Sequence, residues 1–95
     1  MKNTNELDEL ARLLRLLGDP TRLRLLKELV RNQKNVTELG LQLRLRQPAV
    51  SHHLSLLKLG NMVKARRNGK EVMYSLARPK PDAKSKRLIA KLLRP

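Results

Sequence analysis

The residues best suited to recognition chemistry in this chain lie between Gln47 and Ser55. On a helical period of 3.6 residues, Val50, Leu54 and Leu57 share one face and should pack inward. The opposite face is polar and free of acid, with Gln47 in the first turn followed by Pro48, Ser51, His52 and Ser55. Amide, hydroxyl and imidazole groups on such a face suit the floor of the DNA major groove, where they can meet base edges. A solvated face on an ordinary helix could have the same composition, so the neighbouring segments must decide.

The preceding segment reads as a shorter helix joined to this one by a basic turn. Asn35 can cap it, with Glu38 in the capping-box position three residues later. Gly40 lets a second helix approach closely, and Arg44 and Arg46 make the turn basic. The apolar positions that should share its inner face are Val36, Leu39 and Leu43. This spacing predicts a helix-turn-helix, although plain helical hairpins share it.

Beyond Asn61 the apolar period changes from 3.6 to 2, which predicts two strands at 62–67 and 70–76. Asn68-Gly69 between them is typical of a two-residue type I′ hairpin loop. Val72, Tyr74 and Leu76 should share one face. The loop is flanked by four cations, namely Lys64, Arg66, Arg67 and Lys70. Such a hairpin suits backbone phosphate or the minor groove, while charges that merely protect a sheet edge are the alternative.

Composition favours a nucleic-acid partner and disfavours several other classes. The chain has 95 residues, enough for one domain over 1–95, and a formal charge of +14. An anionic membrane surface is the second candidate, but a membrane-binding helix would carry Trp or Phe, and the chain has neither. The absence of cysteine excludes disulfides and thiolate metal sites. No catalytic set or glycine-rich phosphate loop is evident, so we expect neither an enzyme nor a cofactor.

The N-terminal half should form two further helices, after frayed residues 1–5. The first, over 6–17, carries an apolar stripe wide enough to serve a second subunit, which includes Leu7, Leu10 and Leu14. Gly18 suits a left-handed residue, Asp19 an N-cap and Pro20 the first position of the second helix, over 20–31. In that helix Leu23, Leu26, Leu29 and Val30 should face the core, and Arg22, Arg24 and Lys27 should face out.

A linker over 77–81 should lead to a last helix over 82–94. Its apolar stripe includes Leu88, Ile89 and Leu92, and so short a helix needs to pack on something. The first helix is the natural candidate, from the same chain or from a partner.

Two segments together resemble the ArsR-type (arsenic-repressor-like) bacterial transcriptional regulators: Leu-Gly-Asp-Pro-Thr-Arg-Leu-Arg-Leu-Leu over 17–26, and Gln-Pro-Ala-Val-Ser-His-His-Leu over 47–54. The resemblance covers roughly residues 6 to 77. It implies a mainly α fold with a small β-hairpin, a winged helix-turn-helix in the order α-α-α-α-β-β-α. It also implies a homodimer built from the first and last helices, operator binding, and repression that a signal relieves. The family's base-reading positions fall on Gln47, Ser51 and His52, and its wing positions on Arg66, Arg67, Asn68 and Gly69.

Three departures from that family matter. Many members have serine where Arg46 stands, so Gln47 should take over the cap, with Pro48 at the first helical position. Asn61 replaces a usual glycine but tolerates the left-handed conformation. The metal-sensing ligands are missing, because residues 35–37 hold no cysteine and the last helix holds no histidine. His52 and His53 point about 100° apart and cannot chelate one ion, and His53 should face the buried side.

These features predict a sequence-specific repressor that binds a palindromic operator in double-stranded DNA as a homodimer. It would have no metal-sensing site and would work in the bacterial cytoplasm, at the nucleoid. The alternative is a sequence-indifferent basic protein that binds DNA or RNA by charge alone. A measured specificity ratio separates the two, because specific binders typically gain about 10³–10⁷ over non-specific DNA.

Overall fold

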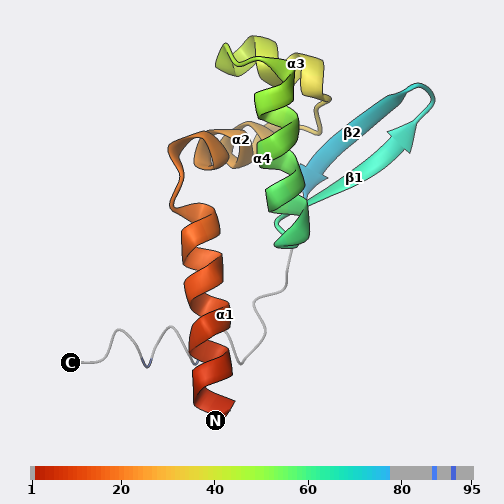
Figure 1. Cartoon of the computed structure of the whole chain (residues 1–95). Coiled ribbons are helices and arrows are strands. Elements are labelled where there is room, and N and C mark those ends of the chain that lie inside the picture. The colour runs from red at the N-terminus through yellow and green to blue at the C-terminus, as the bar shows by residue number, and fades with distance from the viewer. Residues whose placement is uncertain (1, 78–86, 88–90, 92–95) are drawn as a thin grey trace.

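The computed structural model describes residues 2–77, 87 and 91. Its elements are α1 (Lys2–Leu17), α2 (Pro20–Arg31), α3 (Val36–Leu43), α4 (Gln47–Leu59), β1 (Val63–Asn68) and β2 (Glu71–Leu76). Over residues 2–77 the fold is mainly helical, and four helices are followed by a two-stranded antiparallel hairpin, in the predicted order (Figure 1). The last predicted helix, with Leu88, Ile89 and Leu92, lies outside the described residues.

A small aliphatic core joins three helices to the base of the hairpin. Its fully or almost fully buried members are Leu25, Leu29, Leu39, Val50, Leu54, Leu57 and Val63. Each such side chain stabilises the fold by about 1.5–3 kcal/mol relative to an exposed position. The inward face predicted for α4 is therefore confirmed, and α4 is held from one side only.

The starts of α2 and α3 follow the sequence prediction. The Asp19 carboxylate accepts the backbone N–H of Arg22 at 3.0 Å, and Pro20 opens α2. At α3 both halves of a capping box are present. The Asn35 side chain accepts from the Glu38 N–H at 2.8 Å, and the Glu38 side chain accepts from the Asn35 N–H at 3.0 Å.

The predicted inner face of α2 is partly wrong. Leu23 is 50% exposed and Val30 is 69% exposed, whereas Leu25 and Leu29 are buried. Aliphatic residues cover more than one face of this helix, so the sequence alone did not determine which face turns inward. Arg22, predicted to face solvent, turns inward, and its side chain is only 15% exposed.

The junction between α1 and α2 also differs from expectation. The helix α1 begins at Lys2, so residues 2–5 are helical rather than frayed. Gly18 is not left-handed, because Gly69 is the only glycine with a positive φ. A left-handed residue lets backbone N–H groups satisfy the last carbonyls of a helix. Here the Arg22 guanidinium does so instead, donating to the carbonyls of Leu16 and Arg15.

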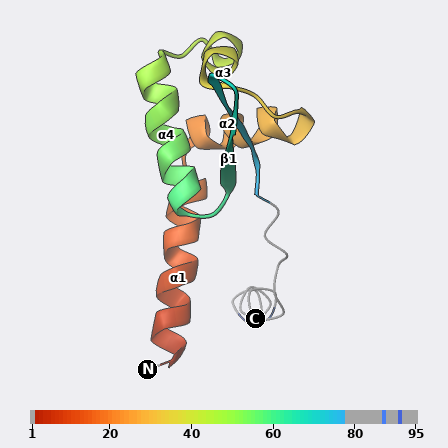
Figure 2. The same ribbon diagram turned by 90° about the vertical axis from the view of Figure 1, so that its right-hand side faces the viewer.

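The helix α1 leaves the core and continues roughly along the line of α4, as Figure 2 shows. The two helices touch where Leu16 packs on Gly60, at the end of α4. A Cβ at Gly60 would overlap the Leu16 side chain, so glycine permits this approach.

The hairpin loop lies one residue later than predicted. Asn68 pairs with Glu71, so Gly69 and Lys70 form the loop, and β1 and β2 begin at Val63 and Glu71. Gly69 has a φ of 65° and Lys70 has no positive φ, which fits a type II′ rather than a type I′ turn. One glycine at the first loop position is sufficient for this turn, and Asn68 remains in the ladder.

The base of the hairpin is fixed while its tip projects from the body (Figure 1). Val63 is buried, and the backbones of Lys34 and Tyr74 exchange hydrogen bonds of 3.0 and 2.8 Å. Val72, predicted to share an inner face with Tyr74 and Leu76, is 38% exposed because it lies toward the tip. None of the helices in the described part of the chain is long and apolar enough to cross a membrane.

Candidate nucleic-acid interface

The outer face of α4 is exposed and polar, as its sequence predicts. Pro48, Ser51, His52 and Ser55 are all exposed, on the side opposite the buried aliphatic residues. The Ser55 hydroxyl donates to the backbone carbonyl of Ser51 at 2.9 Å, which fixes its orientation and leaves its lone pairs available to a donor.

The same face ends in an aliphatic side chain that the sequence-based prediction did not include. Leu59 is 81% exposed and lies four residues after Ser55 and seven after His52. Those intervals place it on the polar face, and they could have identified it from the sequence. A methyl-bearing group there could meet the 5-methyl of thymine.

The first turn of α4 has no side-chain cap. Arg46 occupies the N-cap position without a side-chain hydrogen bond, so the prediction that Gln47 caps the helix is wrong. Gln47 is the first helical residue, and Pro48 follows it. The Gln47 amide instead donates to the Thr37 hydroxyl in α3 at 3.2 Å, a contact between the starts of the two helices that sequence reasoning did not find.

The turn between α3 and α4 is tight. Arg44 adopts a left-handed conformation, with φ 56° and ψ 47°, and the Leu45 N–H donates to the Gly40 carbonyl at 2.9 Å. A Cβ at Gly40 would lie 2.9 Å from the Leu45 carbonyl oxygen, so the glycine permits close approach of the turn itself. Asn61, after α4, has a φ of 58°, which confirms the expected left-handed asparagine.

An open hollow of about 410 Å³ lies outside this turn. Leu41 and Leu45 contribute to its lining, and Thr37, Arg44, Arg46 and Gln47 add polar groups. Arg44 and Arg46 are both exposed, so two cations stand beside the uncapped start of α4. Helix N-termini and cations both favour anions, which makes this a suitable place for a phosphate.

The hairpin presents the second group of cations. Lys64, Arg66, Arg67 and Lys70 are exposed, and none forms an ion pair with a residue in 2–77, 87 or 91. Arg66 lies opposite Met73 and Arg67 opposite Val72, so the two arginines point to opposite faces of the ribbon. Asn68 and Gly69 lie at the exposed tip. The structure therefore gathers the predicted hairpin residues on one projecting element.

The remaining predicted residues concern metals and assembly. Among the residues that the structure describes, no cluster of three or more His, Cys, Asp or Glu side chains could hold a metal ion. On α1, Leu7 is 45% exposed and Leu14 is 58% exposed, while Leu10 is partly buried. The other predicted dimer residues, Leu88, Ile89 and Leu92, lie outside the described residues.

His53 turns away from the polar face of α4. It is partly buried, as predicted, and its Nδ1 lies 3.4 Å from the Arg22 guanidinium. Its ring meets that of His52 edge-on, with centroids 5.6 Å apart.

Comparison with known proteins agrees with this architecture. Residues 19–65 match the family model described as "Bacterial regulatory protein, arsR family". The transcriptional repressor PagR of Bacillus anthracis is 37% identical over 90 residues, which cover 94% of this chain and 85% of that protein. A probable mercury resistance operon repressor of Streptomyces lividans is 42% identical over 73 residues, covering 77% of this chain but only 58% of the relative.

A solved structure supports the fold assignment. The homodimeric winged helix-turn-helix DNA-binding domain of a possible ArsR-family regulator from Mycobacterium bovis superposes with a TM-score of 0.71 at 29% identity. The match covers 90% of this chain and 76% of that one. The fold is thus a winged helix-turn-helix, with α3 and α4 as the motif and β1–β2 as the wing. The chain belongs to the arsR family of bacterial regulatory proteins.

Proposed function

We propose that this protein is a sequence-specific DNA-binding repressor that acts as a homodimer on a two-fold symmetric operator. One observation supports this most strongly: the polar face of α4 is exposed, and exposed cations both precede it along the chain, at the turn before α4, and follow it, on the wing. Ser51, His52 and Ser55 would read base edges, and the cations would contact phosphate. Its place of action is then the bacterial nucleoid.

In this proposal the cations provide affinity for DNA, and the polar face of α4 provides sequence specificity. Phosphate contacts position a protein on the duplex, whereas base-edge contacts discriminate sequences. Six exposed cations are candidates in each subunit: Arg44, Arg46, Lys64, Arg66, Arg67 and Lys70. If half to most of the twelve in a dimer meet phosphate, log K falls with log salt at a slope of about −5 to −11.

The experiment is a selection of bound duplexes from random DNA with the purified protein. We expect a palindromic sequence and, on it, a specificity ratio within the range of specific binders, about 10³–10⁷. His52→Ala should lower affinity for the selected duplex by about 1–3 kcal/mol and leave scrambled DNA nearly unaffected. Arg67→Ala should weaken both alike and make the salt slope shallower. Recovery of no common sequence would favour the sequence-indifferent alternative.

The homodimer is proposed from α1. Leu7 and Leu14 expose much of their aliphatic surface, and the related Mycobacterium bovis domain is homodimeric. Sedimentation should find a dimer at micromolar concentration, and Leu14→Glu should convert it to monomer. Leu41→Glu changes a side chain that is 77% exposed in α3 and should remain dimeric. A well-folded wild-type monomer would refute the assembly.

We also propose that the signal that relieves repression is not a metal ion. The chain has no cysteine, and Asn35, Val36 and Thr37 occupy the stretch just before Glu38. Zinc or mercuric ion added in slight excess should leave affinity for the selected duplex unchanged. Release of that duplex by one equivalent of metal would overturn this part of the proposal.

A further inference from the structure

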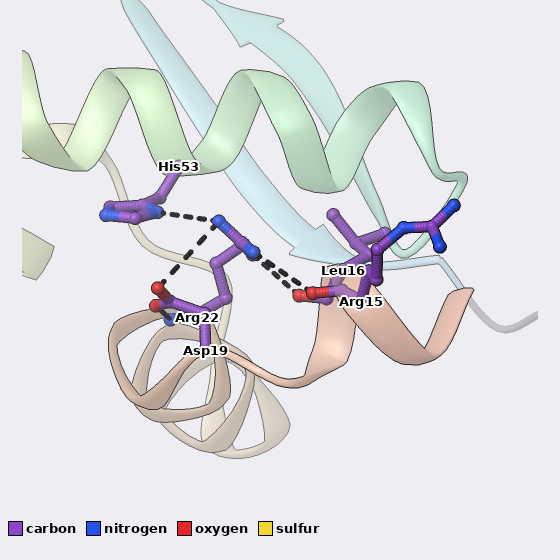
Figure 3. A network of polar contacts seen from close by, with 5 residues as sticks. All are labelled: Arg15, Leu16, Asp19, Arg22 and His53. Carbon is purple, nitrogen blue, oxygen red and sulfur yellow. Dashed lines mark hydrogen bonds and ion pairs between the residues drawn. The ribbon is translucent and has the colours of Figure 1, made fainter. Parts of the chain in front are cut away.

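The Arg22 side chain connects three helices. Its Nε donates to the Leu16 carbonyl at 2.6 Å and its Nη2 to the Arg15 carbonyl at 3.2 Å. Its Nη1 lies 3.4 Å from His53 Nδ1 and 4.0 Å from an Asp19 carboxylate oxygen. Figure 3 shows the guanidinium between the end of α1 and the side of α4. Arg22 itself belongs to α2, so one planar group touches all three helices.

The contacts on the α1 side satisfy groups that the helix cannot satisfy itself. The last carbonyls of an α-helix have no intrahelical partner, and Arg22 supplies two of them with donors. The Arg22 side chain is only 15% exposed, so little water competes for these bonds. Leu16, whose carbonyl is bound, also packs on Gly60 at the far end of α4. The end of α1 is therefore tied to α4 at two points, by Arg22 through His53 and by Leu16 through Gly60.

The contact on the α4 side fixes the chemical form of His53. A guanidinium has donors and no acceptor. His53 Nδ1 must then be the acceptor, which requires the neutral imidazole with its proton on Nε2. A protonated imidazole offers no acceptor and would bring a second positive charge against Arg22.

Two charged groups of α2 face this contact, the Asp19 carboxylate at the N-cap and the Arg22 guanidinium. On α4 itself, His52 lies edge-on to His53. On α1, the Arg15 side chain points away from the cluster (Figure 3). Arg22 is the charged group within hydrogen-bond distance of His53, so protonation of the imidazole would break this link first.

We propose that Arg22 is a positioning residue that sets α4 against α1 through neutral His53, and that protonation of His53 releases α4 and lowers sequence discrimination. The proposal rests on the proposed function, because α4 is taken to read bases. Base-edge hydrogen bonds tolerate only a few tenths of an ångström, and Ser51, His52 and Ser55 move with the helix. Phosphate contacts by flexible cations on the wing do not depend on this link. Loss of the link should therefore reduce discrimination more than total affinity.

The DNA test measures the ratio of affinities for the selected and a scrambled duplex across about pH 5–8, where histidines change charge. His52→Asn serves as the reference chain, since it removes the other imidazole. Because His52 is proposed to read bases, this chain starts from a lower ratio than wild type, and only the change of its ratio with pH is compared. In that chain we expect the ratio to fall by about tenfold on acidification, the effect of one charge-assisted hydrogen bond. Adding His53→Asn should make the ratio independent of pH, because the asparagine oxygen occupies the place of Nδ1 and accepts at every pH. Asparagine and histidine have similar helix propensities, so the pair is matched.

Arg22→Lys supplies the second variant. It keeps the charge but loses the planar fork that reaches two carbonyls and His53. We expect a low ratio at all pH values, with the salt slope and binding to the scrambled duplex unchanged. A purely structural role would lower the melting temperature and leave the pH dependence of the ratio as in the His52→Asn chain.

A measurement without DNA separates this proposal from the proposed function. At neutral pH, the imidazole ¹⁵N resonances of the wild-type protein should show that His53 carries a proton on Nε2 and none on Nδ1. Acidification should then shift the backbone amides of Leu17 and Gly18, and His53→Asn should abolish those shifts. A proton on Nδ1 at neutral pH, or a ratio that still falls on acidification in the double variant, overturns the proposal. Failure to select any common sequence would count against the proposed function, and the resonances would still decide the link.

Discussion

The two helices of the helix-turn-helix begin in opposite ways. The first turn of α3 is closed by a complete capping box, in which Asn35 and Glu38 satisfy each other's backbone N–H groups. The first turn of α4 begins at Arg46, which makes no side-chain cap. These two starts lie side by side, joined by the bond from Gln47 to Thr37. The same small motif therefore contains one helix start that is satisfied internally and one that is left open.

This difference separates stability from binding. A side-chain cap is typically worth about 1 kcal/mol, so α4 lacks that much stabilisation at its start. In exchange, Arg46 places a cation where the helix dipole already favours an anion. The helix α3 is optimised locally, and α4, the helix proposed to meet DNA, is not. Natural sequences often break local rules of this kind at functional sites.

The largest effect on stability should come from opening the closed start. Asn35→Ala removes the α3 cap and also the bond from Asn35 Nδ2 to the Glu71 carboxylate in the wing, at 3.2 Å. We expect the free energy of unfolding to fall by about 1–2 kcal/mol, and the melting temperature by about 4–8 °C per kcal/mol. Denaturation at a fixed protein concentration measures this. Asn35→Asp keeps the cap acceptor and should lose less, and equal stability of Asn35→Ala and wild type would refute the role of the box.

The converse change closes the open start. Arg46→Ser should raise the free energy of unfolding by about 1 kcal/mol, because serine is among the best N-caps. It should also make the salt slope of DNA binding shallower by about 0.9 for each phosphate that the protein no longer neutralises. Arg46→Ala is the matched control, since it removes the charge without adding a cap. If Arg46→Ser binds DNA with an unchanged slope, Arg46 does not contact phosphate.

Structural features that depend on residues close together in the chain were predictable from the sequence. The caps at Asp19 and Asn35 depend on residues within one turn of each other, and both are present. The inward face of α4 was predictable because its three core residues, Val50, Leu54 and Leu57, can all be buried in only one rotation of the helix about its axis. The exposure of the opposite face of α4 follows from the same argument, whereas its role in reading bases stays a prediction.

Features set by contacts between distant segments were not predictable. Arg22 turns inward because the carbonyl of Leu16 and the ring of His53 both accept from it. Leu16 is 6 residues away across the junction between α1 and α2, and His53 is 31 residues away on α4. The end of α1 consequently needs no left-handed Gly18. The wing loop lies one residue later than predicted, because Asn68 pairs with Glu71. The dipeptide Asn-Gly is compatible with two strand registers and does not determine by itself which of them forms.

The start of α2 provides the smallest and last test, because its cap is closed like that of α3 but is charged. The Arg22 backbone N–H lowers the pKa of Asp19 below its ordinary value, partial burial opposes this, and the Arg22 guanidinium adds to the lowering. Asp19 therefore binds a proton more readily in the unfolded chain than in the folded one. The stabilisation of the fold by this carboxylate is complete above the pKa of Asp19 in the unfolded chain, and it is lost as the pH falls through the pKa of Asp19 in the folded protein. Asp19→Asn keeps a cap acceptor but removes the charge. Wild type should therefore be more stable than Asp19→Asn at pH 5, and this difference in the free energy of unfolding should shrink toward pH 2 as the Asp19 carboxylate becomes protonated. Urea denaturation at both pH values measures this, with Asp8→Asn as a control that removes an exposed carboxylate elsewhere, on α1. A difference for Asp19→Asn that is the same at both pH values would show that the charge adds nothing to this cap, leaving α2 equivalent to α3.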